Sequence, residues 1–328
     1  MKKAGVLSIL FVVVLLAVSV IADAQQLKKI SRIGYIGSSA SEQTATNTNA
    51  FRERLRELGY IEGQNITIEY RYFEGKIDRL PELAAELNRL NCDVIVTTGT
   101  EAAEAAKKVI KTLPVVMAFS GDAVRLGIVA DLAHPGGNIT GLTSINAELS
   151  GKRLELLKDV VPGLSRVALL WSAGNVNMEY LLRETESVAR SLRVGVQFLE
   201  VKGPDDFERA FRTTTRDRAE AITLSGGGFF AAHQKRIVDL ATKSRLPAVY
   251  PNVQYVEAGG LMSYAEDRIY MFRRAADYVD KILKGAKPAD LSVERPKRFD
   301  LVINLKTAKQ IGLTIPQSVL YRADKVIK

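Results

Sequence analysis

The chain has 328 residues, of which 47% are hydrophobic and 25% charged, a composition typical of globular proteins. This length predicts two domains. The formal net charge is +9, but basic and acidic residues alternate, as in residues 52–57, and no basic block with interleaved aromatic residues occurs. The pattern argues against a nucleic-acid partner, and the charge instead favours solubility or an anionic ligand.

The first 24 residues have the pattern of an export signal. Lys2 and Lys3 precede an uncharged apolar stretch over residues 4–21, and a small-x-small sequence follows at residues 22–24. This order predicts a signal peptide that is cut after Ala24 and a periplasmic mature protein. A retained membrane anchor is the alternative, because the apolar stretch is almost as long as a bilayer-spanning helix. Cleavage removes two lysines and one aspartate and lowers the formal net charge to +8.

Cys92 is the single cysteine of the chain. An intramolecular disulfide is therefore impossible, and stability must come from the packed cores. A bacterial lipoprotein needs a cysteine at its cleavage point, so the position of Cys92 favours a soluble protein over a lipid-anchored one. Since the apolar run 94–96 follows, we expect Cys92 to be a small buried residue at the start of a strand rather than a reactive thiol.

Short apolar runs alternate with longer segments of helical periodicity in the first half of the chain. The expected strands are residues 32–37, 66–70, 94–96, 115–118 and 139–142. The expected helices are residues 50–58, 80–90, 102–109 and 154–161. The strands are near-continuous apolar runs, as in parallel sheets that are covered by helices on both faces.

The same alternation starts again after Pro162 and Gly163. The expected strands are residues 167–171, 196–201, 221–224, 248–250 and 301–303. The expected helices are residues 180–192, 207–211, 237–241, 267–283 and 306–311, and residues 288–296 are expected to be extended. Two successive β/α series of about five units predict an α/β protein with two doubly wound parallel-sheet lobes. The last part of the chain is too short for a third domain and must complete the first two.

Four sequence blocks in order carry a resemblance to a known family. They are His-Pro-Gly-Gly-Asn-Ile-Thr-Gly at 134–141, Glu-Ala-Gly-Gly-Leu-Met-Ser-Tyr at 257–264, Ile-Leu-Lys-Gly-Ala-Lys-Pro at 282–288 and Leu-Val-Ile-Asn-Leu-Lys-Thr-Ala at 301–308. The mature chain resembles the ABC transporter substrate-binding family that includes tryptophan- and tyrosine-type uptake proteins. The resemblance implies a type I periplasmic-binding fold, in which three hinge strands join two lobes and the ligand is closed between them.

The resemblance also implies where the lobes divide. The chain is expected to cross between lobes near residues 143–147, near 264–267 and within 291–298. Lobe 1 would then comprise residues 30–143 and 266–292. Lobe 2 would comprise residues 144–265 and 293–328.

Ligands of open parallel sheets bind at the carboxyl ends of strands, where loops converge and helix N-termini present free N–H groups. At the strand ends of lobe 1 we expect ligand contacts from Ser38, Ser39, Thr98, Gly99, Thr100, Phe119, Ser120 and Asp122. Thr100 and the N–H groups beside it suit a carboxylate, or Thr100 is only the N-cap of the next helix. Asp122 either holds a ligand ammonium or caps a helix that starts at Val124.

Lobe 2 presents aromatic and small residues at its strand ends and hinge. We expect ligand contacts from Trp171, Ser172, Gly226, Gly227, Tyr250, Asn252 and Tyr264. Aromatic walls with a few polar groups suit a small ligand, although ordinary core packing is the alternative for each ring. The glycine run 226–228 lacks the Lys-Ser/Thr of a P-loop and the spacing of a dinucleotide fingerprint, so a nucleotide cofactor is not expected.

Residue patterns for catalysis or metal binding are missing. The two histidines, His134 in a Pro-Gly turn and His233 in a helix, have no cysteine or carboxylate partners at metal-ligand spacing, and we expect both at the surface. A Gly-x-Ser-x-Gly nucleophile elbow does not occur. We therefore expect no enzyme activity, no metal and no cofactor.

Taken together, the leader, the two lobes and the resemblance predict a monomeric periplasmic solute-binding protein of an ABC importer. Its partners would be a small organic ligand and an ABC permease in the inner membrane. The resemblance and the aromatic strand ends favour an aromatic amino acid or a related acid as ligand. An exported ligand sensor and an α/β enzyme of similar architecture are the alternatives. A cytoplasmic repressor would need a helix-turn-helix where this chain has its apolar leader.

Overall fold

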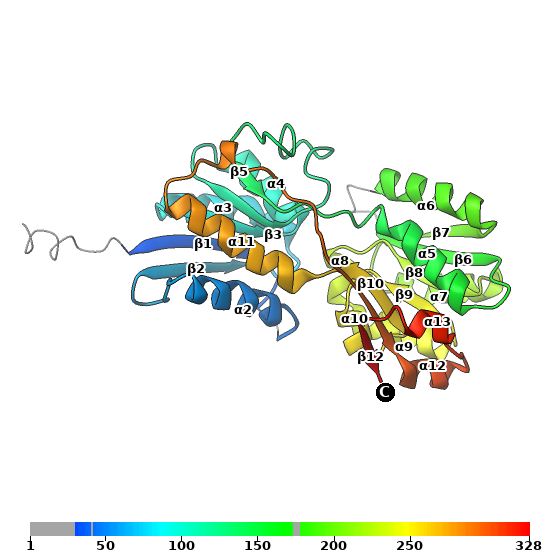
Figure 1. The fold of residues 1–328 in the computed structure, drawn as a ribbon. Helices are drawn as coiled ribbons and strands as arrows, with labels where there is room; N and C mark the ends of the chain where they lie inside the picture. Colours follow the sequence, from blue (N-terminus) through cyan, green and yellow to red (C-terminus); the bar gives the residue numbers. More distant parts are fainter. Residues whose placement is uncertain (1–29, 41, 173–177) are drawn as a thin grey trace, which may run out of the picture.

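The computed structural model describes residues 30–328 except residues 41 and 173–177. The predicted signal peptide, residues 1–24, lies outside the described residues. Figure 1 shows two α/β bodies, each formed by a sheet between helices, with the chain passing from one body to the other along several segments. Among the residues that the structure describes, no helix is both long and apolar enough to cross a membrane.

The first body is built on a five-stranded sheet with the order β2-β1-β3-β4-β5, in which all neighbours are parallel. Its strands are β1 (Ser31–Gly37), β2 (Ile66–Tyr72), β3 (Val94–Thr98), β4 (Val115–Phe119) and β5 (Ile139–Gly141). Its helices are α2 (Glu42–Glu57), α3 (Leu80–Arg89), α4 (Thr100–Val109) and α11 (Arg268–Leu283), with the short 3-10 turns η1 (Ile77–Arg79) and η2 (Pro288–Asp290). The order places a topological switch point between β1 and β3.

Helices cover both faces of this sheet, as the apolar strands require. α3 and α4 pack on one face around Leu87 and Ile95, which are fully buried. α2 and α11 pack on the other face, where Phe51 and Met271 share one core with Val96. A helix from late in the chain therefore completes the core of the first body (Figure 1).

The second body is built on a seven-stranded sheet with the order β12-β11-β10-β9-β8-β6-β7. Its strands are β6 (Arg166–Ser172), β7 (Gly195–Val201), β8 (Ala221–Leu224), β9 (Ala248–Tyr250), β10 (Met262–Glu266), β11 (Phe299–Asn304) and β12 (Lys325–Ile327). Its helices are α5 (Leu149–Val160), α6 (Met178–Leu192), α7 (Asp206–Arg216), α8 (Gly228–Ala232), α9 (Gln234–Lys243), α10 (Gln254–Glu257), α12 (Leu305–Ile311) and α13 (Gln317–Leu320). The order β7-β6-β8-β9-β10 repeats that of the first sheet and places a second switch point between β6 and β8.

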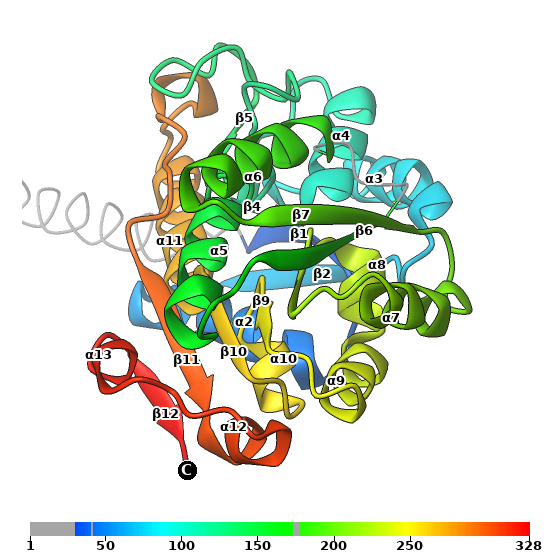
Figure 2. The same ribbon diagram turned by 90° about the vertical axis from the view of Figure 1, so that its right-hand side faces the viewer.

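Helices lie on both sides of the second sheet as well. α5, α12 and α13 pack on one face around Leu157 and Ile303, whereas α7, α9 and α10 pack on the other face around Phe207 and Tyr255. Figure 2, which views the molecule from the side of the second body, shows α5 and α7 on opposite sides of the sheet. The predicted α/β fold with two doubly wound sheets is therefore confirmed.

Several features of the fold differ from the sequence prediction. The short elements α8, α10, α13 and β12 were not predicted, and η2 lies at the start of the segment 288–296 that was expected to be extended. α2 begins at Glu42 rather than near residue 50, because the polar run 42–49 has no apolar periodicity that would reveal a helix. β10 was not predicted as a strand. It pairs antiparallel with β11, so the second sheet is not wholly parallel. The chain leaves the second sheet along β10 and returns to it along β11, which makes the two neighbours run in opposite directions.

The two sheets are connected by three chain segments, residues 142–148, 264–268 and 291–298, which we call the joint. These segments bond to one another: Thr143 N donates to Glu294 O over 2.9 Å, and Asp267 N donates to Arg298 O over 3.0 Å. Backbone hydrogen bonds between crossing segments fix their spacing while leaving the bodies on either side as separate cores.

Candidate functional site

Each switch point ends in a glycine with the same unusual backbone conformation. Gly99, after β3, precedes α4 with φ 101° and ψ 160°, and Gly227, after β8, precedes α8 with φ 102° and ψ 163°. These values lie in a region that residues with a side chain avoid. Both glycines stand at the N-cap position of the following helix without a capping side chain, so free backbone N–H groups face outward there.

The first switch point holds five of the predicted residues, one of which is Gly99. Thr98 is buried, and its Oγ1 donates to Ile36 O over 3.3 Å. Ser38 and Ser39 are half-buried, and Ser38 O accepts a hydrogen bond from Glu74 N over 2.9 Å. The alternative that Thr100 is only an N-cap is wrong, because Gly99 occupies that position. Thr100 Oγ1 instead accepts a hydrogen bond from Gly121 N over 2.9 Å and connects this switch point to the end of β4.

The end of β4 combines an aromatic ring with polar groups. The half-buried Phe119 ring lies 6.0 Å from Phe272, and the guanidinium carbon of Arg268 lies 3.6 Å from the centre of the same ring. Ser120 is fully buried, and its Oγ has no hydrogen-bond partner among the described residues. Buried polar atoms are normally satisfied, so an unpaired hydroxyl at a strand end is a candidate for contact with a ligand.

Asp122 lies in a turn and does not cap a helix. The predicted helix from Val124 is absent, and residues 123–130 form turns and bends. Asp122 Oδ1 accepts a hydrogen bond from Arg125 N over 3.1 Å, and its Oδ2 lies 4.0 Å from Arg125 Nε. Aspartate readily stabilises such turns by bonding a backbone N–H a few residues later.

At the second switch point, Trp171 lies beside the Gly226-Gly227 turn that follows β8. Trp171 is half-buried against a small cluster with Leu169 and Leu181, and Ser172 is buried. Gly226 is buried with φ 78°, and Asn146 of the joint approaches it. Trp171 is therefore a ring with part of its surface free at the carboxyl end of β6.

The remaining predicted residues follow β9 and β10. Tyr250 is 1% exposed and stacks on Tyr255 with ring centres 4.8 Å apart, and burial raises the pKa of both hydroxyls. Asn252 is half-buried, with its Oδ1 buried and without a partner among the described residues. Tyr264 is half-buried and stacks on Phe299 at 6.2 Å. Tyr250 is thus mainly a core residue, whereas Asn252 retains an unused acceptor.

Arg153, which the sequence analysis did not single out, is a buried arginine in α5 that binds the joint. It is 0% exposed, and its Nε donates to Tyr264 O over 2.9 Å while Nη2 donates to Asn146 Oδ1 over 2.8 Å. The Asn146 amide is thereby oriented so that its Nδ2 donates to Ser225 O over 3.0 Å. One side chain therefore fixes two crossing segments and the start of the Gly226 turn.

Glu266 is a second buried charge of the joint. Its Oε1 accepts hydrogen bonds from Ser144 Oγ over 2.5 Å and from Ile145 N over 2.7 Å, and its side chain is 3% exposed. Burial lowers the pKa of Arg153 to about 10, an effect that the nearby Glu266 carboxylate opposes. Sequence spacing gave no signal for this network, because several of its contacts join residues more than 100 positions apart, such as Ser144 and Glu266.

A contact across the joint involves the turn after β4 and α6. The guanidinium of Arg125 lies 4.2 Å from the centre of the Tyr180 ring. Glu148 lies in the same region, where burial and then the neighbouring carboxylates of Asp122 and Glu184 raise its pKa. Three carboxylates gather on this side of the joint beside Arg125 and Arg295, whereas on the other side the guanidiniums of Arg153 and Arg268 lie near Glu266.

The two histidines and Cys92 take no part in these arrangements. His134 is exposed, whereas His233 lies between α8 and α9, half-buried against the rings of Phe207 and Phe229. Cys92 is 2% exposed, and burial raises its pKa to about 11, as expected for an unreactive core residue. Among the described residues, no group of three or more His, Cys, Asp or Glu side chains is placed to hold a metal ion.

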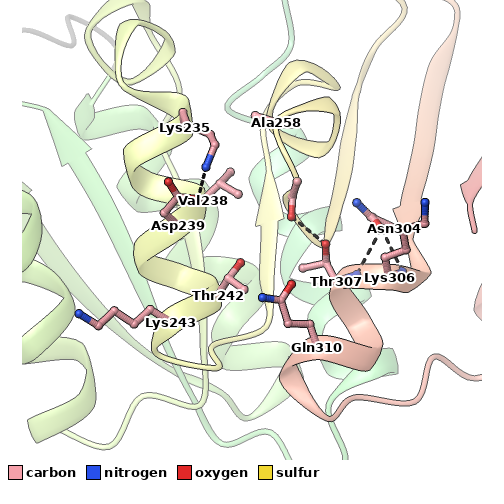
Figure 3. Close-up of a pocket in the computed structure, with 11 residues that line it drawn as sticks. Lys235, Val238, Asp239, Thr242, Lys243, Ala258, Asn304, Lys306, Thr307 and Gln310 are labelled. Atoms are coloured by element: carbon pink, nitrogen blue, oxygen red, sulfur yellow. Dashed lines mark hydrogen bonds and ion pairs between the residues drawn. The ribbon is translucent and has the colours of Figure 1, made fainter.

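A hollow with a volume of about 470 Å³ lies away from the predicted site, between α9 and α12 (Figure 3). It is lined by polar side chains including Lys243, Lys306 and Gln310, and Lys235 forms an ion pair with Asp239 at its rim. None of the predicted ligand-binding residues lines it. Its open, lysine-rich surface differs from the mainly apolar walls that are typical of small-ligand pockets.

Comparisons with known proteins agree with this architecture. The model of the family described as ABC transporter substrate binding protein matches residues 41–327. A domain from Streptococcus pneumoniae, solved in complex with L-Trp, is 28% identical, covers 90% of this chain and 99% of its own, and has a TM-score of 0.83. A conserved domain protein from Vibrio cholerae is 26% identical, covers 91% of this chain and 100% of its own, and has a TM-score of 0.85. A tyrosine-binding protein from Clostridioides difficile is 21% identical over 80% of this chain and 75% of its own.

Proposed function

Because the chain belongs to the ABC transporter substrate binding protein family, we propose that it captures an aromatic amino acid or a related acid between its two bodies. The family is one of solute-binding proteins rather than enzymes. We assign residues 30–143 and 266–292 to lobe 1 and residues 144–265 and 293–328 to lobe 2. This assignment places α11 with the core that it completes and β11 with the sheet that it joins.

The observation that carries the proposal is the position of the two switch points relative to the joint. Ser144 N, in the joint, donates to Ser120 O at the end of β4 over 2.6 Å, and Asn146 Nδ2 donates to Ser225 O at the end of β8. The carboxyl ends of both sheets therefore border one set of crossing segments. Open α/β sheets bind ligands at such ends, and a site between two bodies can use both.

The unused polar groups at these ends suit the two charged groups of an amino acid. On the lobe 1 side, the α4 N-terminus at Gly99 offers N–H donors to a carboxylate, and the unpaired hydroxyl of Ser120 is buried at the neighbouring strand end. On the lobe 2 side, the Oδ1 of Asn252 offers an acceptor to an ammonium. Phe119 and Trp171 supply the apolar surface against which an aromatic side chain would stack.

Ligand-dependent closure follows from this division of contacts. A ligand that touches both bodies stabilises the arrangement in which they approach, and the bodies rotate about the joint. We propose that the closed form delivers the ligand to an ABC permease in the inner membrane, and that the mature protein acts in the periplasm after cleavage at Ala24. The relative with bound L-Trp supports an aromatic amino acid as the first ligand to test.

Thermal unfolding with candidate ligands tests the proposal. We expect L-tryptophan, L-tyrosine, L-phenylalanine or an aromatic acid to raise the melting temperature, because a ligand at one hundred times its Kd adds about 2.7 kcal/mol to the stability of the native state. Titration calorimetry would then give the affinity. A protein that responds to none of these compounds, but to a sugar or an inorganic ion, would refute the proposed ligand class.

Trp171→Ala tests the proposed place of binding. We expect it to weaken binding by about tenfold or more, because a half-buried ring that stacks on a ligand contributes on the order of 1–2 kcal/mol. Tyr321→Ala is the matched control, since this aromatic side chain is 82% exposed and lies outside the proposed site. Unchanged affinity in Trp171→Ala would place the ligand elsewhere.

A further inference from the structure

Arg268 is a half-buried cation at the proposed site that lacks a hydrogen-bonded partner. Its side chain is 23% exposed, and its guanidinium lies over the Phe119 ring. Its nearest carboxylate oxygen is Oε2 of Glu266 at 3.7 Å, which is beyond hydrogen-bond range. Within the part of the chain that the structure describes, the five N–H donors of this guanidinium make no hydrogen bond, although buried arginines normally use several.

Glu266 does not neutralise the charges around it. Its Oε1 is occupied by Ser144 and Ile145, and its single negative charge faces two guanidiniums, those of Arg153 and Arg268. Arg153 donates three hydrogen bonds, to the backbone oxygens of Tyr264 and Asn146 and to Asn146 Oδ1, and none of these oxygens is charged. Burial disfavours the charged form of both arginines and lowers their pKa. Glu266 and these two guanidiniums together carry a formal charge of +1, and Asp267, directly before Arg268, is a further carboxylate of the same segment.

The position of Arg268 on its helix is also unfavourable by itself. Arg268 is the first residue of α11, whose N-terminus carries the positive end of the helix dipole. The N-cap Asp267 accepts a hydrogen bond from Tyr270 N over 2.8 Å and offsets part of this conflict. Proteins break such local preferences mainly at functional sites. The placement of Arg268 at a helix N-terminus is therefore consistent with a role in binding an anionic group.

A second source of positive potential borders the same ring. The ring atom Cζ of Phe119 lies 4.0 Å from the place that a Cβ on Gly99 would occupy. The free N–H groups at the start of α4 and the guanidinium of Arg268 therefore both adjoin Phe119. The Glu101 carboxylate also lies here, with Oε2 3.6 Å from the same Cβ position. An anionic group beside this ring would therefore meet this carboxylate as well as the N–H groups and the guanidinium, of which the last two attract negative charge.

We propose that Arg268 binds the carboxylate of the ligand at the Phe119 end of the site, and that this contact restricts the ligands of the protein to carboxylates. The proposal rests on the proposed function and deepens it by naming a specificity-determining residue. The guanidinium lies over the Phe119 ring, and the weak attraction of Glu266 helps to keep it there. The ligand carboxylate then supplies the close partner that Glu266, at 3.7 Å, does not.

Paired ligands test the role of Arg268. Titration calorimetry on the wild-type chain would use L-tryptophan, L-tyrosine, indole-3-acetate and benzoate, together with the neutral-ended analogues L-tryptophanamide and L-tyrosinamide. We expect each amide to bind about 10- to 100-fold more weakly than its acid, the range of a charge-assisted contact. Arg268→Gln should weaken the acid by a similar factor and leave the amide nearly unchanged, and Arg268→Lys should retain part of the affinity.

Arg273→Gln is the matched control on the same helix. Arg273 forms a partly exposed ion pair with Glu57. Its substitution removes the same positive charge as Arg268→Gln, but away from the proposed site, so the Arg273→Gln variant should bind acids and amides as the wild type does. If Arg273→Gln and Arg268→Gln weakened binding of the acids equally, the loss would follow from the lower net charge of the protein, and the proposal would be overturned.

The outcomes separate this proposal from the proposed function. If the wild type binds an aromatic amino acid and Arg268→Gln binds it equally well, Arg268 is not the carboxylate contact, whereas the proposed function stands. If benzoate or another acid binds, aromatic amino acids do not, and Arg268→Gln loses the acid, the role of Arg268 stands and the proposed amino acid is wrong. A wild type that prefers amides to acids overturns the role of Arg268 alone, and a wild type that binds no carboxylate overturns both proposals.

Discussion

The two sheets share one strand order at the joint and differ in the side chains that they place there. The orders β2-β1-β3-β4-β5 and β7-β6-β8-β9-β10 each create a switch point that ends in an N-cap glycine. The first sheet ends in a ring covered by a cation, Phe119 under Arg268. The second sheet ends in an uncharged stack, Tyr250 on Tyr255.

This difference shows that the shared topology sets where loops meet and the side chains set what they can bind. The end of the first sheet has spare donors, the guanidinium of Arg268 and the hydroxyl of Ser120. The end of the second sheet has a spare acceptor at Asn252 and the partly exposed ring of Trp171, whereas Tyr250 is packed. We interpret the first sheet as the side that holds the anionic end of a ligand, and the second as the side that closes on the rest of it.

Arg153→Met should have the largest effect on this arrangement, because Arg153 fixes the second-sheet side to the joint. The substitution leaves the carbonyl of Tyr264 and the oxygens of Asn146 without their buried donor. We expect the free energy of unfolding to fall by about 3 kcal/mol, since each unsatisfied buried acceptor costs roughly 1–3 kcal/mol. Urea unfolding measures this free energy. Arg273→Met is the control: it removes a partly exposed ion pair and should lower the free energy of unfolding by less than about 1 kcal/mol.

An unchanged unfolding free energy in Arg153→Met would mean that water replaces the guanidinium at no cost. The joint would then be a loose connection, and the orientation of Asn146 toward Ser225 would need another cause. A fall of the expected size, with weaker ligand binding at temperatures where the variant is folded, would support Arg153 as the residue that positions Asn146.

Gly260→Ala should have an intermediate effect that is confined to the second sheet. A Cβ at this position would lie 2.6 Å from a ring atom of Tyr250 and 2.7 Å from Tyr255 O, so the tyrosine stack would have to shift. Overpacking of this kind costs about 1–3 kcal/mol. Chemical denaturation and near-ultraviolet circular dichroism would report the stability and the tyrosine environment. Gly137→Ala is the control, because a Cβ there has open space; equal behaviour of the two variants would show that the stack is not tightly held.

The sequence was a good guide to the parts of the fold that depend on local apolar pattern. The buried runs at residues 94–96 and 115–118 predicted β3 and β4, and their ends led to Gly99 and Phe119. The first half of α2 was missed because its polar residues gain stability from tertiary contacts, such as the hydrogen bond of 3.0 Å between Tyr35 Oη and Thr48 Oγ1.

The parts of the candidate site that were missed depend on contacts between distant segments. Arg153 lies in a helix whose neighbouring leucines predicted only core packing, and its partner Tyr264 is 111 residues away. Arg268 belongs to an ordinary amphipathic helix, and its place over Phe119 follows from the return of α11 to the first sheet. Pattern reasoning assigns faces to elements but does not assign partners across a joint.

Glu148→Gln should have the smallest effect and tests the side of the joint where the three carboxylates gather. Burial first, and then the carboxylates of Asp122 and Glu184, raise the pKa of Glu148 in the folded state, while Arg295 opposes the shift. A raised pKa means that ionised Glu148 destabilises the native state. This penalty is absent below the ordinary value of 4.5 and is complete once the pH exceeds the raised pKa.

We therefore expect Glu148→Gln to unfold at slightly higher urea concentration than the wild type at pH 7 to 8, and the difference to vanish near pH 4. Glu208→Gln is the control of opposite sign, because Arg236 holds the pKa of Glu208 below its usual value and the exposed pair is lost on substitution. Its small destabilisation should be present at neutral pH and fade as the pH falls. If Glu148→Gln behaved like Glu208→Gln, Glu148 would be held by a cation, and the contrast between the two sides of the joint would be wrong.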